Sequence, residues 1–177
     1  VIACNTATAY GLEDIRAAIA TWKVPVIVVG VVEAGARGVV EAKSAGGIGV
    51  LATGGTCASG VYPRTITSAL GLAGRSVPLI AQQGSATLAG AIEGDTAFPE
   101  PVAAYALREA RSLAQAYRDL QPSQPLQTII LGCTHYEIVA DLFAAALPPG
   151  TPVIHQPTAV ADALARYFER HPEYDLG

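Results

Sequence analysis

Short, continuously apolar runs alternate along the chain with longer Ala-rich segments whose apolar residues recur at helical spacing. Continuous runs predict strands covered on both faces, whereas recurrence every three or four residues predicts helices packed on a sheet. The predicted strands are residues 1–3, 25–32, 47–52, 78–81, 128–131 and 151–154. The predicted helices are residues 12–21, 34–45, 65–72, 100–120, 138–146 and 158–170. This alternation of strand and helix predicts βαβ units and therefore a parallel α/β fold.

Composition narrows the class of protein. Of the 177 residues, 51% are hydrophobic, which is enough for a buried core. The net charge of −4 argues against a polybasic surface that binds nucleic acid or membranes. No apolar run approaches the ~20 residues of a membrane helix, and no secretory leader is visible. Three widely spaced cysteines are not a disulfide framework, so we expect a cytoplasmic protein. The chain contains no methionine and starts as if in mid-strand, so we expect a trimmed chain.

Two of the cysteines occur in matching surroundings. The segments VIACNT (residues 1–6) and ILGCTH (residues 130–135) each run from an apolar strand through a small residue to a cysteine, followed by polar side chains and a helical pattern. Ligands of parallel α/β sheets bind beyond the carboxyl ends of the strands, so Cys4 and Cys133 are predicted to face a ligand. A helix N-terminus also favours anions and lowers the pKa of a thiol.

Other interpretations of these thiols stay open at this point. A single cysteine after a strand is most often a small buried hydrophobe. Metal binding fits poorly, because neither cysteine has a second ligand at zinc spacing apart from His135, and no metal is predicted. A Cys–His hydrolase would need Cys133 and His135 to meet, although side chains two residues apart diverge on a helix.

The same two segments resemble the paired motifs of the glutamate racemases, within the aspartate/glutamate racemase superfamily. These motifs are VIACNTATA (residues 1–9) and LGCTHY (residues 131–136). Further similar stretches are GVVEAGA (residues 30–36), IGVLAT (residues 48–53), GTCASGVY (residues 55–62) and the closing segment 160–175. The resemblance covers essentially the whole chain, and the two cysteine motifs together make it specific.

The resemblance implies a cofactor-independent racemisation of L-glutamate to D-glutamate, which supplies D-glutamate for peptidoglycan synthesis. Racemisation needs a base on one face of the α-carbon and an acid on the other, and two thiols provide both. By this resemblance Cys4 and Cys133 are the catalytic pair, and His135 assists Cys133. The substrate-binding residues that it implies are Asn5, Thr6, Thr53, Thr56, Thr134 and His135.

Two further positions follow from the same comparison. Glu93 is expected to be a catalytic carboxylate, because QGSA (residues 83–86) aligns with the family's Gln-x-Cys-Pro stretch, whose Cys and Pro are absent here. An exposed carboxylate at a helix end is the alternative for Glu93. Cys57 is interpreted as a packing residue. Glu137 stands where the family usually has proline after His-Tyr, which alters a helix start.

The family's Asp-Ser-Gly motif, which supplies a catalytic Asp and a substrate-binding Ser, does not occur in this sequence. The resemblance implies two α/β lobes related by a pseudo-two-fold, with the substrate between them. We therefore expect the first lobe to be incomplete, and this chain alone to be inactive or nearly so. Residues 1–30 and 153–177 are assigned to the first lobe, and residues 31–152 to the second.

Two other functions remain under consideration. An aspartate or hydantoin racemase of the same superfamily would share the two thiols, although residues 30–36 and the Thr134-His135-Tyr136 run favour glutamate. A non-catalytic domain that binds an acidic metabolite would keep the fold without using the thiols. The expected partner is a small molecule, with no cofactor, nucleic acid or membrane. The oligomeric state is left open, a homodimer included.

Overall fold

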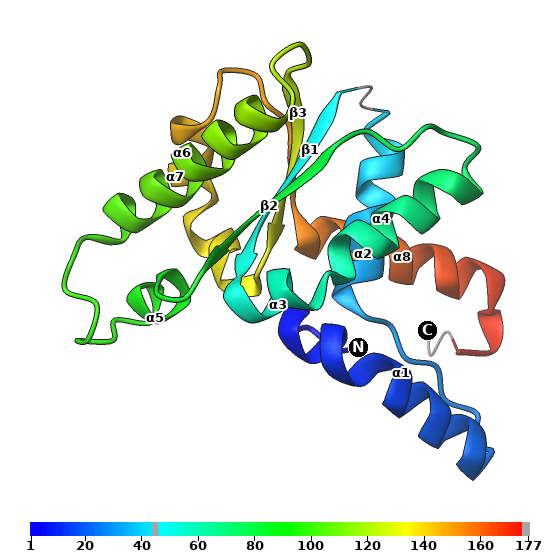
Figure 1. Cartoon of the computed structure of the whole chain (residues 1–177). Helices are drawn as coiled ribbons and strands as arrows, with labels where there is room; N and C mark the ends of the chain where they lie inside the picture. Colours follow the sequence, from blue (N-terminus) through cyan, green and yellow to red (C-terminus); the bar gives the residue numbers. More distant parts are fainter. Residues whose placement is uncertain (44–45, 175–177) are drawn as a thin grey trace.

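Four parallel strands form the sheet in this computed structural model, which describes residues 1–43 and 46–174. The strand order is β2-β1-β3-β4, with β1 (Gly47–Thr53) and β3 (Leu126–Gly132) in the centre. The edges are β2 (Ile80–Ser85) and the two-residue β4 (Val153–Ile154). The parallel α/β fold predicted from the alternating apolar runs and helical segments is confirmed (Figure 1).

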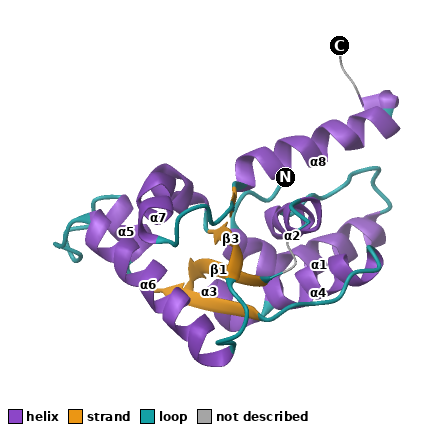
Figure 2. Cartoon of the chain, turned by 90° about the horizontal axis from the view of Figure 1, so that it is seen from above, coloured by secondary structure: helices purple, strands orange, loops and turns teal. Residues whose placement is uncertain are grey.

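Helices flank the sheet on both faces (Figure 2). On one face lie α2 (Val31–Glu41), α4 (Val61–Leu72) and α8 (Gln156–Arg170). On the other lie α5 (Leu88–Ile92), α6 (Val102–Leu120) and α7 (Ala140–Ala146). The remaining elements are α1 (Asn5–Trp22), α3 (Gly54–Ser59) and the 3-10 helices η1 (Thr134–Val139) and η2 (Pro172–Tyr174).

Each face of the sheet buries its own hydrophobic core. The core under α6 includes Leu51, Leu113 and Tyr117, whereas the core under α2 and α4 includes Val50 and Ile66. Val50 and Leu51 are neighbours on β1 and are both fully buried, because successive side chains of a strand point to opposite faces. A central strand covered on both faces therefore has a continuously apolar sequence.

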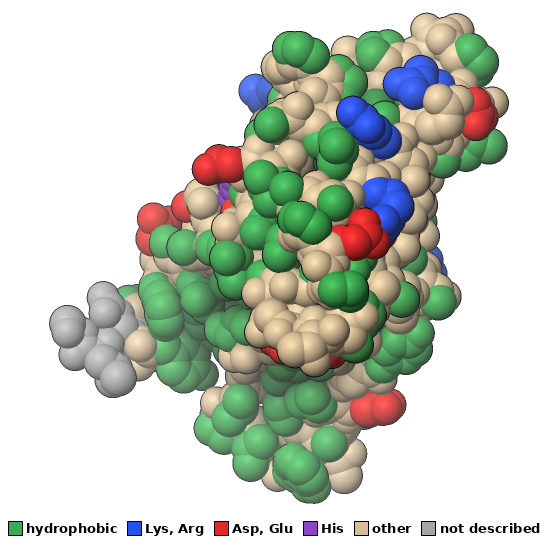
Figure 3. Space-filling view, turned by 90° about the vertical axis from the view of Figure 1, so that its left-hand side faces the viewer, with side chains coloured by type: hydrophobic (Ala, Val, Ile, Leu, Met, Phe, Trp, Pro, Cys, Tyr) green, Lys and Arg blue, Asp and Glu red, His purple; other side chains and the backbone are tan. Residues whose placement is uncertain are grey.

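Helix α6 of the α5–α7 layer is amphipathic. Tyr105 and Tyr117 of α6 are buried, whereas Arg111 and Arg118 on the same helix are exposed. On this side of the molecule charged side chains are separated by apolar and neutral polar ones rather than gathered into one surface (Figure 3). Among the helices in the described ranges, none combines the length and the apolar character needed to cross a membrane.

The predicted strands at residues 1–3 and 25–32 are wrong. Only one parallel bridge, between Ile2 and Gly30, joins these two segments, and α2 already begins at Val31. Val26 and Ile27 are 56% and 48% exposed. A run of residues becomes a strand only when a neighbour takes its backbone hydrogen bonds, and apolar character alone does not reveal whether one lies alongside.

Several helix boundaries also differ from the prediction. α1 begins at Asn5 instead of residue 12, which makes Cys4 its N-cap. The helices α3 and α5 were not predicted, because segments of six and five residues are too short to show a helical period. Residues 44–45 of the predicted helix 34–45, and residues 175–177 at the end of the closing segment, lie outside the described residues. The division into two lobes remains a prediction.

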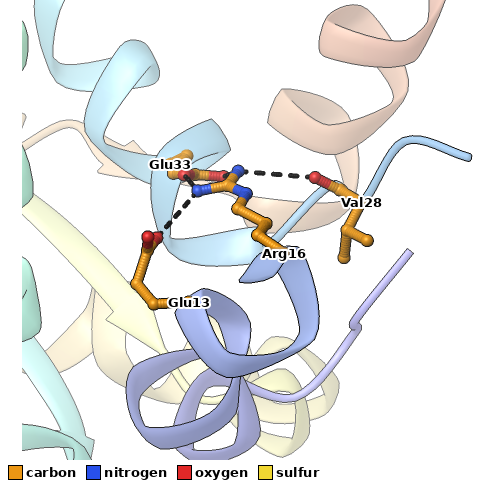
Figure 4. Close-up of polar contacts among 4 residues, drawn as sticks. All are labelled: Glu13, Arg16, Val28 and Glu33. Atoms are coloured by element: carbon orange, nitrogen blue, oxygen red, sulfur yellow. Dashed lines mark hydrogen bonds and ion pairs between the residues drawn. The ribbon is translucent and has the colours of Figure 1, made fainter. Parts of the chain in front are cut away.

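Arg16 ties the middle of α1 to the start of α2 (Figure 4). Its guanidinium donates hydrogen bonds to Glu13 and Glu33, both at 3.0 Å, and to the carbonyl of Val28 at 3.4 Å. The side chains of Arg16 and Glu33 are each 39% exposed, so water screens their charges and such a pair contributes only ~0.2–1 kcal/mol. The ion pair orients α1, but buried contacts are needed to fix it.

Gly47, at the start of β1, leaves no room for a side chain, since a Cβ there would overlap the buried ring of Tyr117. We therefore expect Gly47→Ala to lower the free energy of unfolding by about 1–3 kcal/mol, as in other overpacked cores. Gly11, inside α1 with no atom within 4 Å of an added Cβ, provides the matched control. Gly11→Ala should instead raise stability by up to about 1 kcal/mol. Urea denaturation measures both, and an unchanged Gly47→Ala variant would contradict the packing described.

Candidate active site

The carboxyl ends of the strands gather the residues predicted to bind the substrate. Thr53 ends β1 and Cys133 directly follows β3, so both lie at the same edge of the parallel sheet. The first turn of α1 lies at this edge because it contacts α3, which directly follows β1 (Figure 1). Cys4 is exposed there, and its sulfur accepts a hydrogen bond from the backbone N–H of Ala7 at 3.5 Å. Both cysteines therefore stand at helix N-caps at the end of the sheet where ligands of this fold class bind.

The Cys133 thiol is buried and has two opposing influences on its acidity. Burial raises its pKa, because a thiolate loses solvation, while the nearby backbone N–H groups of His135 and Tyr136 lower the pKa. Negative charge at Cys4 and at Glu93 raises it further. The two thiols are therefore close enough for the charge of one to act on the other.

Cys133, His135 and Glu93 form a chain of three side chains. The sulfur of Cys133 lies 3.7 Å from Nδ1 of His135, and Nε2 of His135 lies 2.5 Å from Oε1 of Glu93. We expected side chains two residues apart to diverge, but Cys133 has an extended backbone before a 3-10 helix, which lets the imidazole turn back. Glu93 ends α5, and only the fold brings it to His135. Its catalytic role stays a prediction.

The Asn5 side chain is bound by the protein itself. Its Oδ1 accepts hydrogen bonds from Tyr62 at 2.6 Å and from Nε2 of Gln156 at 2.9 Å, and its Nδ2 donates to Oε1 of Gln156 at 2.8 Å. All three residues are buried, and the Tyr62 hydroxyl also contacts Gln156. Gln156 was not identified from the sequence, where its only signal was a polar residue two positions after a predicted strand, and Tyr62 was assigned no role.

Three threonines predicted to contact the substrate meet one another. The hydroxyl oxygens of Thr6, Thr53 and Thr56 lie 2.9–3.0 Å apart in a triangle that joins α1 to the end of β1 and to α3. A hydroxyl both donates and accepts, so such a triangle can reorganise around a polar ligand. Thr134 is exposed at the first residue of η1, directly after Cys133.

Cys57 differs from the other two cysteines. It lies within α3, and burial raises the pKa of its thiol to about 11, which keeps it protonated and unreactive near neutral pH. Its sulfur would lie 3.5 Å from a Cβ at Gly84, an ordinary packing distance. Across the part of the chain that the structure describes, no group of three or more His, Cys, Asp or Glu side chains could hold a metal ion.

Comparison with known proteins gives relatives over the whole chain. The chain is 37% identical over 202 aligned residues to a glutamate racemase from Caulobacter sp. (strain K31), covering 100% of this chain and 65% of that protein. Over 48 residues, 27% of this chain and 17% of the relative, it is 79% identical to a glutamate racemase from Phenylobacterium zucineum (strain HLK1). The chain thus spans less than two thirds of the length of these relatives.

Solved structures give the same fold. A glutamate racemase from Thermus thermophilus in complex with β-chloro-D-alanine superposes with a TM-score of 0.62 at 27% identity, over 98% of this chain and 57% of that one. Glutamate racemase isoform RacE1 from Bacillus anthracis, at 24% identity, gives a TM-score of 0.71 over 95% of this chain and 56% of that one, which shows the fold alone.

A model of the Asp/Glu/Hydantoin racemase family matches residues 1–164, which include both cysteine motifs and every residue of the candidate site. The chain belongs to the Asp/Glu/Hydantoin racemase family.

Proposed function

We propose that the protein containing this chain interconverts L- and D-glutamate by removing and returning the proton on the α-carbon. The observation that carries the proposal is the pair of thiols, Cys4 and Cys133, at two helix N-caps and within electrostatic reach of each other. Support also comes from the relatives in Caulobacter and Thermus, which are named glutamate racemases.

In the proposed reaction, the thiolate of one cysteine takes the α-proton from one face of the substrate. The electron pair left on the α-carbon is delocalised into the adjacent carboxylate. The thiol of the other cysteine then gives its proton to the opposite face, so the configuration inverts and the two thiols exchange protonation states. No cofactor enters this sequence, and atoms and charge balance within the pair of sulfurs and the substrate.

The surroundings of Cys133 fit this role. The N–H groups of His135 and Tyr136 stabilise a thiolate that burial alone would disfavour. His135 can exchange a proton with the sulfur through Nδ1 while Glu93, at Nε2, stabilises the imidazolium. Among the cysteines that the structure describes, only Cys133 is linked through a histidine to a carboxylate, whereas the Cys4 sulfur contacts a backbone N–H.

The substrate carboxylates are proposed to bind between the two cysteine segments. The N-terminus of α1 offers free backbone N–H groups and the positive end of a helix dipole. The hydroxyls of Thr6, Thr53 and Thr56, together with Thr134 beside Cys133, supply further donors. Asn5 has its side-chain carbonyl oxygen and one amide hydrogen occupied, so it is proposed to contact the substrate through its second amide hydrogen.

The cellular role, the substrate range and the oligomeric state are part of the same proposal. D-Glutamate would serve peptidoglycan synthesis, and the three free thiols suit a reducing cytoplasm. The family's name includes aspartate and hydantoins, so L-aspartate and a 5-substituted hydantoin belong in the substrate panel. Inversion of glutamate at least tenfold faster than of either is expected, and equilibrium sedimentation will establish whether the protein is a homodimer.

Replacing the buried thiol tests the mechanism in the full-length natural protein. Cys133→Ser keeps the size of the side chain but removes the acidic group, so we expect racemisation followed by circular dichroism to fall by ~10²–10⁴-fold. Cys57→Ser is the matched control and should retain wild-type turnover, because Cys57 lies outside the proposed pair. Near-normal turnover by Cys133→Ser would contradict the two-thiol mechanism, whereas no turnover by the wild type would favour the non-catalytic binding domain.

Thiol reactivity separates the three cysteines. At pH 7.5 a pKa of about 11 leaves roughly 0.03% of Cys57 as thiolate, against roughly 10% for an unperturbed thiol. We therefore expect iodoacetamide to modify the exposed Cys4 at least about a hundredfold faster than Cys57, whose rate should rise about tenfold per pH unit up to pH 11. Buried Cys133 should react more slowly than Cys4.

Bound glutamate should slow the modification of Cys4 and Cys133 while leaving Cys57 unchanged. Peptide mass spectrometry of timed reactions gives all three rates. Protection of Cys57, or equal rates at all three thiols, would contradict this assignment of the site.

A further inference from the structure

The junction between β4 and α8 contacts both cysteine segments at once. His155 is the N-cap of α8 and Gln156 is its first residue, so these neighbours share one short stretch of backbone. The Gln156 side chain binds Asn5, which directly follows Cys4. The His155 side chain pairs with Glu137, which lies on η1, four residues after Cys133.

The Gln156 side of the junction is a buried pair of amides. Two hydrogen bonds, at 2.8 and 2.9 Å, join the amides of Gln156 and Asn5 in both directions, and the Tyr62 hydroxyl contacts both residues. Gln156 is 2% and Asn5 3% exposed, so water cannot replace a lost partner. A buried amide left without a hydrogen-bond partner destabilises the fold, so this pairing strongly favours one position for the start of α1.

The His155 side of the junction holds a largely buried carboxylate. Oε1 of Glu137 pairs with Nδ1 of His155, while Oε2 is buried and has no hydrogen-bond partner among the described residues. The Glu137 side chain is only 20% exposed, so the pairing with His155 is the main interaction that offsets the loss of its hydration. In the resemblance noted above, this position usually carries proline, so here a side-chain contact takes over the fixing of η1.

We propose that the His155–Gln156 junction is a positioning element that sets the separation between the sulfurs of Cys4 and Cys133. Neither residue is proposed to touch the substrate; each acts through the residue that it holds, Glu137 on one side and Asn5 on the other. The inference rests on the proposed racemisation for its functional meaning, but the geometric claim stands independently of the substrate.

The separation of the sulfurs decides the fate of the deprotonated substrate. A carbanion that meets a correctly placed thiol on its far face inverts, whereas one whose far thiol is displaced takes a proton back from the near side. In D₂O the near-side thiol exchanges with solvent, so return without inversion puts deuterium into the starting enantiomer. The ratio of deuterated starting enantiomer to inverted product therefore reports on positioning, and general loss of folded protein leaves it unchanged.

The first test uses that ratio in the full-length protein. Gln156→Leu keeps the volume but removes both hydrogen bonds, and we expect kcat to fall at least about tenfold, KM to change less than about threefold, and the deuterium ratio to rise at least about threefold. His155→Ala should act in the same direction, and His155→Gln, which keeps an N–H donor, should recover most of the loss. Leu164→Ala loosens the packing of α8 away from the junction and should leave the ratio at the wild-type value.

The second test needs no substrate. In a Cys57→Ala background, dibromobimane joins two thiols that face one another, and each thiolate displaces one bromide. We expect a Cys4–Cys133 cross-link in the wild type and in Leu164→Ala, with at least about threefold less in Gln156→Leu and His155→Ala.

The outcomes separate the two proposals. If glutamate shows no α-proton exchange in the wild type, the proposed function fails while the cross-linking result still decides the positioning role. An unchanged cross-link yield in Gln156→Leu, an unchanged deuterium ratio in a variant with reduced kcat, or no cross-link in the wild type would each overturn the positioning role.

Discussion

The buried pairing of Asn5 with Gln156 is the contact on which the placement of Cys4 depends. Cys133 follows β3 directly, so the sheet itself fixes it. Cys4 has no comparable support, because its segment joins the rest of the chain by a single backbone bridge at Ile2. Its position is therefore set by side chains on α1, and at Asn5 those hydrogen bonds are almost wholly shielded from water. The Arg16 ion pair is partly exposed and the Tyr10 hydrogen bond to Gly55 is exposed, so both contribute less.

The fold could be predicted from the sequence where strands are covered on both faces. β1 and β3 follow from their continuous apolar runs, since Val50 and Leu51 belong to opposite cores and both must be apolar. The same rule failed at residues 25–32, where Val26 and Ile27 are apolar but exposed. Apolar character indicates that a segment can be buried, but whether a neighbouring strand lies beside it depends on the rest of the fold.

The candidate site also contains residues that the sequence could predict and residues that it could not. Cys4 and Cys133 could be found because each belongs to a local motif of strand, thiol and helix start. His135 contacts Cys133 only because η1 is a 3-10 helix with an extended N-cap, a geometry that its sequence does not specify. Gln156 and Asn5 are separated by 151 positions, and a polar residue after a strand gives no sign of its partner. Local chemistry was thus predictable, while the contacts that hold it in place depend on long-range packing.

The two thiols lie in unlike environments, Cys4 exposed and Cys133 buried, and this asymmetry is compatible with the proposed reaction. Enantiomers have equal free energies in water, so the equilibrium constant of a racemisation is one and kcat/KM must be equal in both directions whatever the acidity of each thiol. Unequal thiols can change kcat and KM separately, because they change which protonation state of the free protein binds each enantiomer. A substrate lying over Cys4 would also remove water from that sulfur, which makes its surroundings more like those of Cys133. The requirement on the fold is therefore the correct placement of two sulfurs on opposite faces of one carbon atom, and matched environments in the free protein are not needed.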